Sequence, residues 1–103
     1  MNTVVIRIPT PLRSYTQGID EVRVRGNTVA EALQALGAAH DGVLARVLSP
    51  DGEPRQFVNI YLGSQNVRAH KGLQTPVKDG DVISIIPAVA GGDDDESQGP
   101  QTG

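Results

Sequence analysis

The chain has 103 residues, enough for one small domain, and its 38% hydrophobic content includes only 3% aromatic residues. It has no cysteine, which excludes a disulfide scaffold, a thiolate metal site and a cysteine nucleophile. The net charge of −3 is uneven, because residues 93–96 supply four of the twelve acidic groups and residues 1–92 carry nine basic and eight acidic groups. Because the chain has no basic cluster and almost no aromatic residues on which bases could stack, we expect no nucleic-acid binding. We also expect a cytoplasmic protein with no membrane contact, because no apolar run approaches the roughly 20 residues of a membrane span and no signal peptide is evident.

Apolar and polar residues alternate over residues 3–8 and again over residues 19–25, which predicts two strands. Pro9 should end the first strand, because proline cannot donate a hydrogen bond to a neighbouring strand. Residues 14–18 predict the turn between them. We therefore expect an antiparallel hairpin at the N-terminus.

A helix is predicted to begin after Thr28. Thr28 and Glu31 fit a capping box, in which each side chain accepts a hydrogen bond from a backbone amide of the first turn. Apolar residues then recur at helical spacing through Leu36. Residues 41–48 predict one further short helical turn, and residues 49–52, Ser-Pro-Asp-Gly, are typical of a tight turn.

The second half of the chain predicts strands over residues 57–62 and 82–86, with a short edge strand over residues 66–69 between them. Pro87 should end the last strand. Residues 88–103 are rich in Gly, Ala, Asp and Gln, and we expect them to be disordered without a partner.

This order of elements predicts an α+β domain, a mixed sheet of four to five strands with one main helix on one face. The first and last strands can lie side by side and parallel, because the helix supplies the long crossover that parallel strands need. We divide the chain into a folded domain (1–87), an arm (88–92) and an acidic extension (93–103).

The end of the domain carries the most specific motif. After Asp79-Gly80-Asp81 and an apolar strand come Pro87-Ala88-Val89-Ala90-Gly91-Gly92. This ending resembles the terminus of the MoaD/ThiS family of ubiquitin-like sulfur carriers, whose β-grasp fold has the same order of elements. Residues 8–13, 57–61 and 66–68 most resemble the branch of that family that delivers sulfur for cysteine synthesis.

The resemblance implies a function for Gly92. An E1-like adenylyltransferase and sulfurtransferase would use ATP to adenylate the Gly92 carboxylate, and a sulfur donor would convert it to a thiocarboxylate. In the cysteine branch, a pyridoxal-phosphate-dependent cysteine synthase uses this sulfur and a zinc-dependent peptidase releases the product. The chain would be a substrate of these enzymes, with no catalytic residue and no bound cofactor. His40 and His70 are too few and too isolated for a metal site.

The acidic extension departs from the family, whose members typically end at the second glycine. Here the carbonyl of Gly92 is joined to Asp93, so Gly92 has no carboxylate to activate. We predict that the chain is a precursor cut between Gly92 and Asp93, with the zinc peptidase as candidate. The alternatives are that the extension is inert or foreign to the natural chain, or that Gly103 is the activated end.

The last strand is apolar on both faces, although one helix can cover only one of them. If Ile83 and Ile85 face the core, an apolar patch remains on the opposite face, and such patches usually mark binding surfaces. Alternatively, residues 41–56 cover this patch, or it is ordinary exposed apolar surface. The predicted partner-binding surface consists of Phe57, Tyr61, Arg68, Val82 and Ile86, with Lys71 and Lys78 forming a basic rim with Arg68 unless these cations are simply solvated.

Three other functions remain open from the sequence. One is the small subunit of molybdopterin synthase, which uses a thiocarboxylate on a different acceptor. Another is a ubiquitin-like modifier that joins target lysines through Gly92. The third is an interaction module without activation chemistry.

Overall fold

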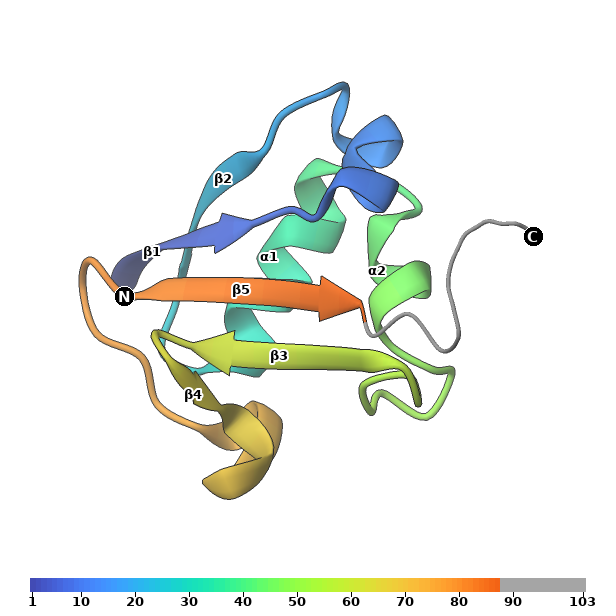
Figure 1. Ribbon diagram of the computed structural model, residues 1–103. Helices are drawn as coiled ribbons and strands as arrows, with labels where there is room; N and C mark the ends of the chain where they lie inside the picture. Colours follow the sequence, from blue (N-terminus) through green and yellow to red (C-terminus); the bar gives the residue numbers. More distant parts are fainter. Residues whose placement is uncertain (88–103) are drawn as a thin grey trace.

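The computed structural model describes residues 1–87, and in it five strands form one mixed sheet in the order β2-β1-β5-β3-β4. Figure 1 shows β1 and β5 running in the same direction, with β3 opposed to them. The strands are β1 (Asn2–Arg7), β2 (Glu21–Gly26), β3 (Val58–Leu62), β4 (Gln65–Asn66) and β5 (Val82–Pro87). The predicted parallel pairing of the first and last strands is confirmed.

Helix α1 (Val29–Ala39) crosses one face of the sheet, and the short helix α2 (Val43–Val47) follows it. The predicted capping pair is present, because the backbone N–H of Glu31 donates to Thr28 Oγ1 at 3.2 Å. The Glu31 carboxylate accepts from the backbone N–H of Asn27 at 2.8 Å, one residue before the cap. Both side chains therefore fix the start of α1.

We expect Thr28→Ala to lower the free energy of unfolding by about 1 kcal/mol, because the Glu31 amide loses its acceptor. For a domain of this size, that loss corresponds to a fall in Tm of about 4–8 °C. Thermal unfolding followed by circular dichroism measures the change. Thr28→Ser keeps the hydroxyl acceptor and is the control, so an equal loss in both variants would contradict the capping role.

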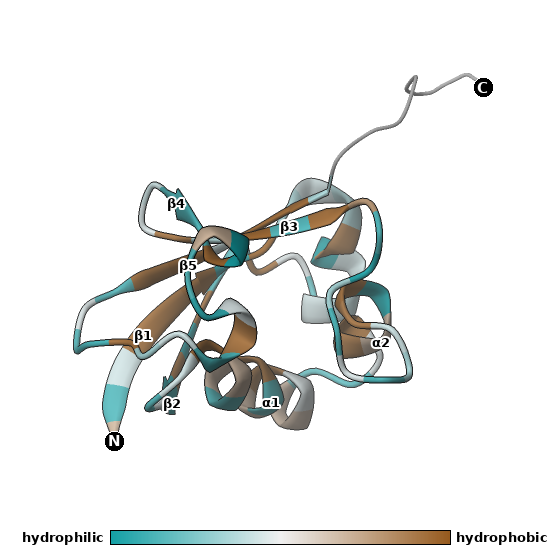
Figure 2. Cartoon of the chain, turned by 90° about the horizontal axis from the view of Figure 1, so that it is seen from below, coloured by the Kyte–Doolittle hydropathy of each residue, from teal (hydrophilic) through white to brown (hydrophobic). Residues whose placement is uncertain are grey.

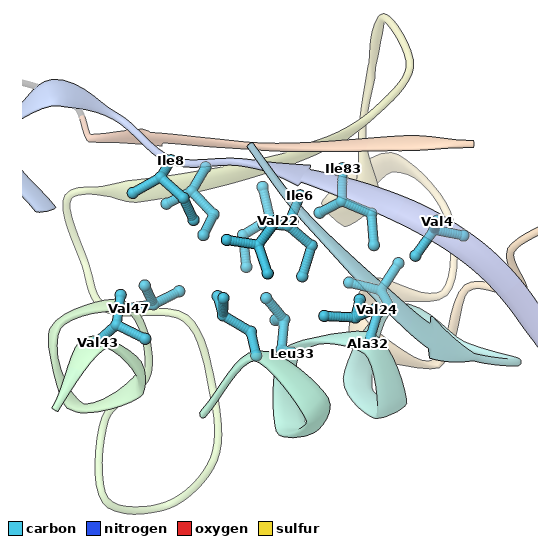
Figure 3. Close-up of a cluster of buried hydrophobic side chains, with 14 of the residues drawn as sticks. Val4, Ile6, Ile8, Val22, Val24, Ala32, Leu33, Val43, Val47 and Ile83 are labelled. Atoms are coloured by element: carbon cyan, nitrogen blue, oxygen red, sulfur yellow. The ribbon is translucent and has the colours of Figure 1, made fainter. Parts of the chain in front are cut away.

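The core lies between the sheet and the helices. In Figure 3, Val4, Ile6 and Ile83 project from the sheet toward Ala32 and Leu33 of α1, and all five are fully buried. Figure 2 shows α1 and α2 on the same side of the sheet. The opposite face of the sheet therefore has no helix packed on it within the described part of the chain.

The predicted turn at residues 14–18 is only partly correct, because a 3₁₀ helix, η1 (Thr10–Thr16), fills most of the connection between β1 and β2. Pro11 lies in its first turn, where the fixed φ of proline suits a helix start and the missing N–H costs nothing. The buried Thr16 hydroxyl donates to the carbonyl of Ile19 at 2.7 Å and closes the segment. The second strand begins at Glu21 for this reason, two residues later than predicted.

The predicted short edge strand is present, but its predicted bounds of 66–69 are wrong. The strand is β4, which covers only Gln65–Asn66 and pairs with β3, and residues Val67–Ala69 form the 3₁₀ helix η2. The Asn66 side chain causes the change, because its Oδ1 accepts from the backbone N–H of Arg68 at 2.9 Å and turns the chain. A further 3₁₀ helix, η3 (Gly72–Gln74), leads toward β5.

Candidate functional site

The arm begins at one end of the sheet. Strand β5 continues one residue further than predicted and includes Pro87, which pairs with Val58 at the start of β3. Because β1 and β5 are parallel, the end of β1 lies at the same end of the sheet. The predicted arm residues Ala88, Val89, Ala90, Gly91 and Gly92, and the predicted cleavage partner Asp93, lie outside the described residues.

Strand β5 separates a buried face from an outer face. Ile83 and Ile85 are buried, as predicted, whereas Ile86 is 46% exposed and Val82 is half-buried. On the neighbouring strand, Tyr61 is half-buried and lies opposite Ser84 of β5.

Phe57 lies just before β3, although the strand was predicted to include it, and its side chain is 52% exposed. Asn59, two residues after Phe57, pairs with Ile86 on the neighbouring strand. Phe57 therefore lies diagonally across from Ile86. Phe57 and Ile86 thus lie together at the end of β5 from which the arm leaves, whereas Val82 begins the strand at its opposite end.

The register adds Val5 to this surface. Val5 of β1 is paired with Val82 of β5 and, like Val82, it is half-buried. Val5 was not predicted, because Thr3 and Arg7, which point to the same side of β1, are polar and suggest a face exposed to solvent. We call Val5, Phe57, Tyr61, Val82 and Ile86 the outer sheet surface.

Residues 41–56 do not cover the outer sheet surface. Val43 and Val47 of α2 are fully buried, and Leu48 joins them in the core on the helix side of the sheet. Phe57 and Ile86 are among the most exposed large apolar side chains of the described residues. The alternative in which this segment folds over the surface is therefore wrong.

Arg68 lies near the start of the arm, because its Nη2 donates to the carbonyl of Val58, the partner of Pro87, at 3.4 Å. Lys78 instead precedes β5 and lies near the opposite end of that strand, where its backbone N–H donates to Asp81. The predicted basic rim joining Arg68 with Lys78 is therefore wrong.

The remaining ionisable groups of the described residues do not form a second candidate site. Within residues 1–87, no group of three or more His, Asp or Glu side chains is placed to hold a metal ion. The pKa of the Asp51 carboxyl, in an exposed turn, is lowered by the hydrogen bond from the Ser49 hydroxyl and further by the backbone N–H of Glu53. No helix of the described residues is long and apolar enough to cross a membrane.

Comparison with known proteins gives consistent matches over the domain and arm. The profile of the ThiS family matches residues 6–92. The sulfur carrier protein CysO of Mycobacterium tuberculosis is 41% identical over 91 residues, which cover 86% of this chain and 98% of CysO.

Solved structures confirm the β-grasp fold. The complex of BexX with CysO from Amycolatopsis orientalis contains a chain that matches with a TM-score of 0.81 and 40% identity, covering 86% of this chain and 99% of that one. SAMP1 from Haloferax volcanii matches with a TM-score of 0.75 and 28% identity, covering 88% of this chain and all (100%) of SAMP1.

Proposed function

The chain belongs to the ThiS family, and we propose that it is a sulfur carrier that works through the carboxylate of Gly92. The observation that carries this proposal is the position of Gly92. The family match ends on Gly92, five residues after Pro87, the last residue of β5. Six residues from Pro87 to Gly92 span at most about 20 Å, enough to place a carboxylate inside a partner's active site.

The proposed chemistry starts with an unreactive carboxylate. An E1-like enzyme transfers AMP from ATP to the Gly92 carboxylate, which releases pyrophosphate and forms a mixed anhydride. A sulfide equivalent then attacks the carbonyl and displaces AMP, which leaves a thiocarboxylate. Gly91 and Gly92 suit a narrow channel, because no Cβ limits the approach of the enzyme's backbone. The chain itself contributes position and binding.

The proposed branch is cysteine synthesis. It is supported by the 41% identity to CysO along nearly the whole length of that protein. In this branch a pyridoxal-phosphate-dependent cysteine synthase accepts the sulfur, and a zinc-dependent peptidase removes residues from Gly92. We propose that a peptidase of this kind also cuts between Gly92 and Asp93, because adenylation requires a free carboxylate.

A ubiquitin-like modifier is the second candidate function. It is favoured by the similarity to SAMP1, a small archaeal modifier protein whose whole chain is covered by the structural match. Both functions begin with adenylation of Gly92, and they differ in the nucleophile that follows. A modifier would form an isopeptide bond with a lysine, whereas a carrier forms a thiocarboxylate.

One experiment separates these functions. Residues 1–92 are incubated with an E1-like activating enzyme, ATP and sulfide, and the products are analysed by intact mass. A gain equal to the difference between sulfur and oxygen supports the carrier, and a series of heavier lysine conjugates supports the modifier. A mass that does not change with ATP contradicts both.

The outer sheet surface gives a second test. We expect Phe57→Asp and Ile86→Asp to lower the kcat/KM of adenylation by about tenfold to a hundredfold, because burying a Phe or Ile side chain at an interface contributes about 1.5–3 kcal/mol. Ile19→Asp is the matched control. Ile19 is 42% exposed but precedes β2, two strands away from β5. Unchanged kinetics in folded Phe57 and Ile86 variants would rule out this surface as the docking site.

A further inference from the structure

Three Asp-Gly pairs lie in the described part of the chain, and they are Asp41-Gly42, Asp51-Gly52 and Asp79-Gly80. An Asp-Gly pair can isomerise, because glycine has no Cβ to hinder the approach of its backbone nitrogen to the preceding side-chain carboxyl. The aspartate and the glycine of every pair are exposed, so exposure does not distinguish the pairs. Their hydrogen bonds do.

Two of the pairs are restrained at both of the groups that would have to react. In Asp51-Gly52, the glycine N–H donates to the carbonyl of Ser49 at 2.9 Å, and the carboxylate accepts from the Ser49 hydroxyl. This hydroxyl lowers the pKa of the Asp51 carboxyl and so favours its unreactive, ionised form. In Asp79-Gly80, the glycine N–H donates to the carbonyl of Thr3 at 2.9 Å, and the carboxylate accepts from the backbone N–H of Thr3 at 2.6 Å. Ring closure in either pair would first have to break these bonds.

The pair Asp41-Gly42 lacks both restraints. Within residues 1–87, the Gly42 N–H donates to no acceptor, and the Asp41 carboxylate accepts no hydrogen bond and forms no ion pair. The N–H of His40 still donates to the carbonyl of Leu36 at 2.9 Å and ends α1, and α2 begins at Val43. The nucleophile and the electrophile therefore lie between the two helices without a hydrogen bond to hold either in place.

We propose that Asp41-Gly42 is the site at which the folded domain converts aspartate to isoaspartate, with water as the only co-reactant. The Gly42 nitrogen attacks Cγ of the protonated Asp41 carboxyl. A bond forms between this nitrogen and Cγ, and the carboxyl hydroxyl leaves with the amide proton as water. The product is a cyclic succinimide. This modification goes beyond the proposed function, because it needs neither an enzyme nor the terminal glycines.

Hydrolysis of the succinimide completes the conversion. Water adds at the main-chain carbonyl of residue 41, and the bond between that carbonyl and the Gly42 nitrogen breaks. The chain then runs through Cβ and Cγ, and a free carboxylate remains on Cα. One water is lost and one is gained, so the mass and the oxidation state of the protein do not change.

The conversion should loosen α2, because it adds one atom to the main chain between α1 and α2. Gly42 has a φ of +89°, and a Cβ on it would lie 3.2 Å from Cδ1 of Tyr15. The next residue, Val43, is fully buried. A longer main chain cannot keep Gly42 against Tyr15 and Val43 in a close-packed core at the same time. We therefore expect the isomerised protein to have a lower Tm than the unmodified protein.

The test compares the three pairs within one chain. The folded protein and the same protein in denaturant are incubated and then digested with trypsin, which places the pairs in separate peptides, 26–46, 47–55 and 79–103. Electron-transfer fragmentation identifies isoaspartate in each peptide. In the folded protein, we expect it to form about tenfold faster at Asp41 than at Asp51 or Asp79, because only these two must first break hydrogen bonds. In denaturant, the three rates should converge.

Asp41→Glu and Asp51→Glu are matched variants, because glutamate would have to close a larger ring, which forms far more slowly. Asp41→Glu should remove most of the isoaspartate formed by the folded protein, and Asp51→Glu should remove almost none. Equal rates at the three pairs in the folded protein, or a slower rate at Asp41, overturn the proposed site. An isomerised fraction that keeps the Tm of the unmodified protein overturns the effect on α2. Since no activating enzyme is present, these outcomes do not depend on whether Gly92 can be activated.

Discussion

A chain that ends at Gly92 is expected to form a thiocarboxylate with its activating enzyme, ATP and sulfide, whereas the 103-residue chain is expected to form none at Gly92. The reason is chemical. In the longer chain the Gly92 carbonyl is an amide to Asp93, and an amide has no carboxylate oxygen to attack ATP. The expected effect is complete loss, measured as the mass change of the intact chain after reaction.

Asp93→Pro in the full chain is the control for cleavage, because few peptidases cut before proline. Added peptidase should restore activity to the natural sequence and leave this variant inactive. Protein recovered from its own cell should end at Gly92. A chain that always retains residues 93–103 in the cell would contradict maturation, and a thiocarboxylate located at Gly103 would show that the other end is activated.

Ile83→Ala is expected to lower the free energy of unfolding by about 2–5 kcal/mol, since it leaves a cavity in the centre of the core. Ile83 is fully buried and pairs with Ile6 on β1 and Leu62 on β3. For a domain of this size, the smaller figure alone corresponds to a fall in Tm of at least about 8 °C. Chemical and thermal denaturation both measure the loss.

Ile86→Ala is the matched control on the same strand. Ile86 is 46% exposed on the outer face, and its truncation should cost about 1 kcal/mol or less. The pair therefore tests which face of β5 supports the fold. Equal losses would mean that the outer sheet surface is packed against part of the domain and is not available to a partner.

Much of the fold could be predicted from the sequence because buried apolar residues recur at every second position of β1 and β2. The alternating apolar residues of β1 and β2 are buried in the core, as predicted. The predicted cap at Thr28 lies at the start of α1. The 3₁₀ segments could not be predicted in the same way. Pro9 was interpreted as ending a strand but also caps the start of η1, and the side chain of Asn66 overrides the strand pattern that follows it.

The outer sheet surface was partly predictable for a related reason. Two apolar faces on β5 and one helix imply that one face stays outside, which identified Val82 and Ile86. Val5 was missed because its role depends on the pairing with Val82, which only the register reveals.

The central position of β5 also determines when this protein can fold. β5 pairs with β1, the first strand of the chain, and with β3, so the sheet stays divided until the last strand has been synthesised. Contacts between such distant parts of a sequence form slowly, and a nascent chain cannot form them before residue 87 has left the ribosome. A ribosome that stalls before β5 would release a chain that can neither close its sheet nor carry the terminal glycines. Residues 82–92 therefore supply both the strand that closes the sheet and the two glycines of the proposed function.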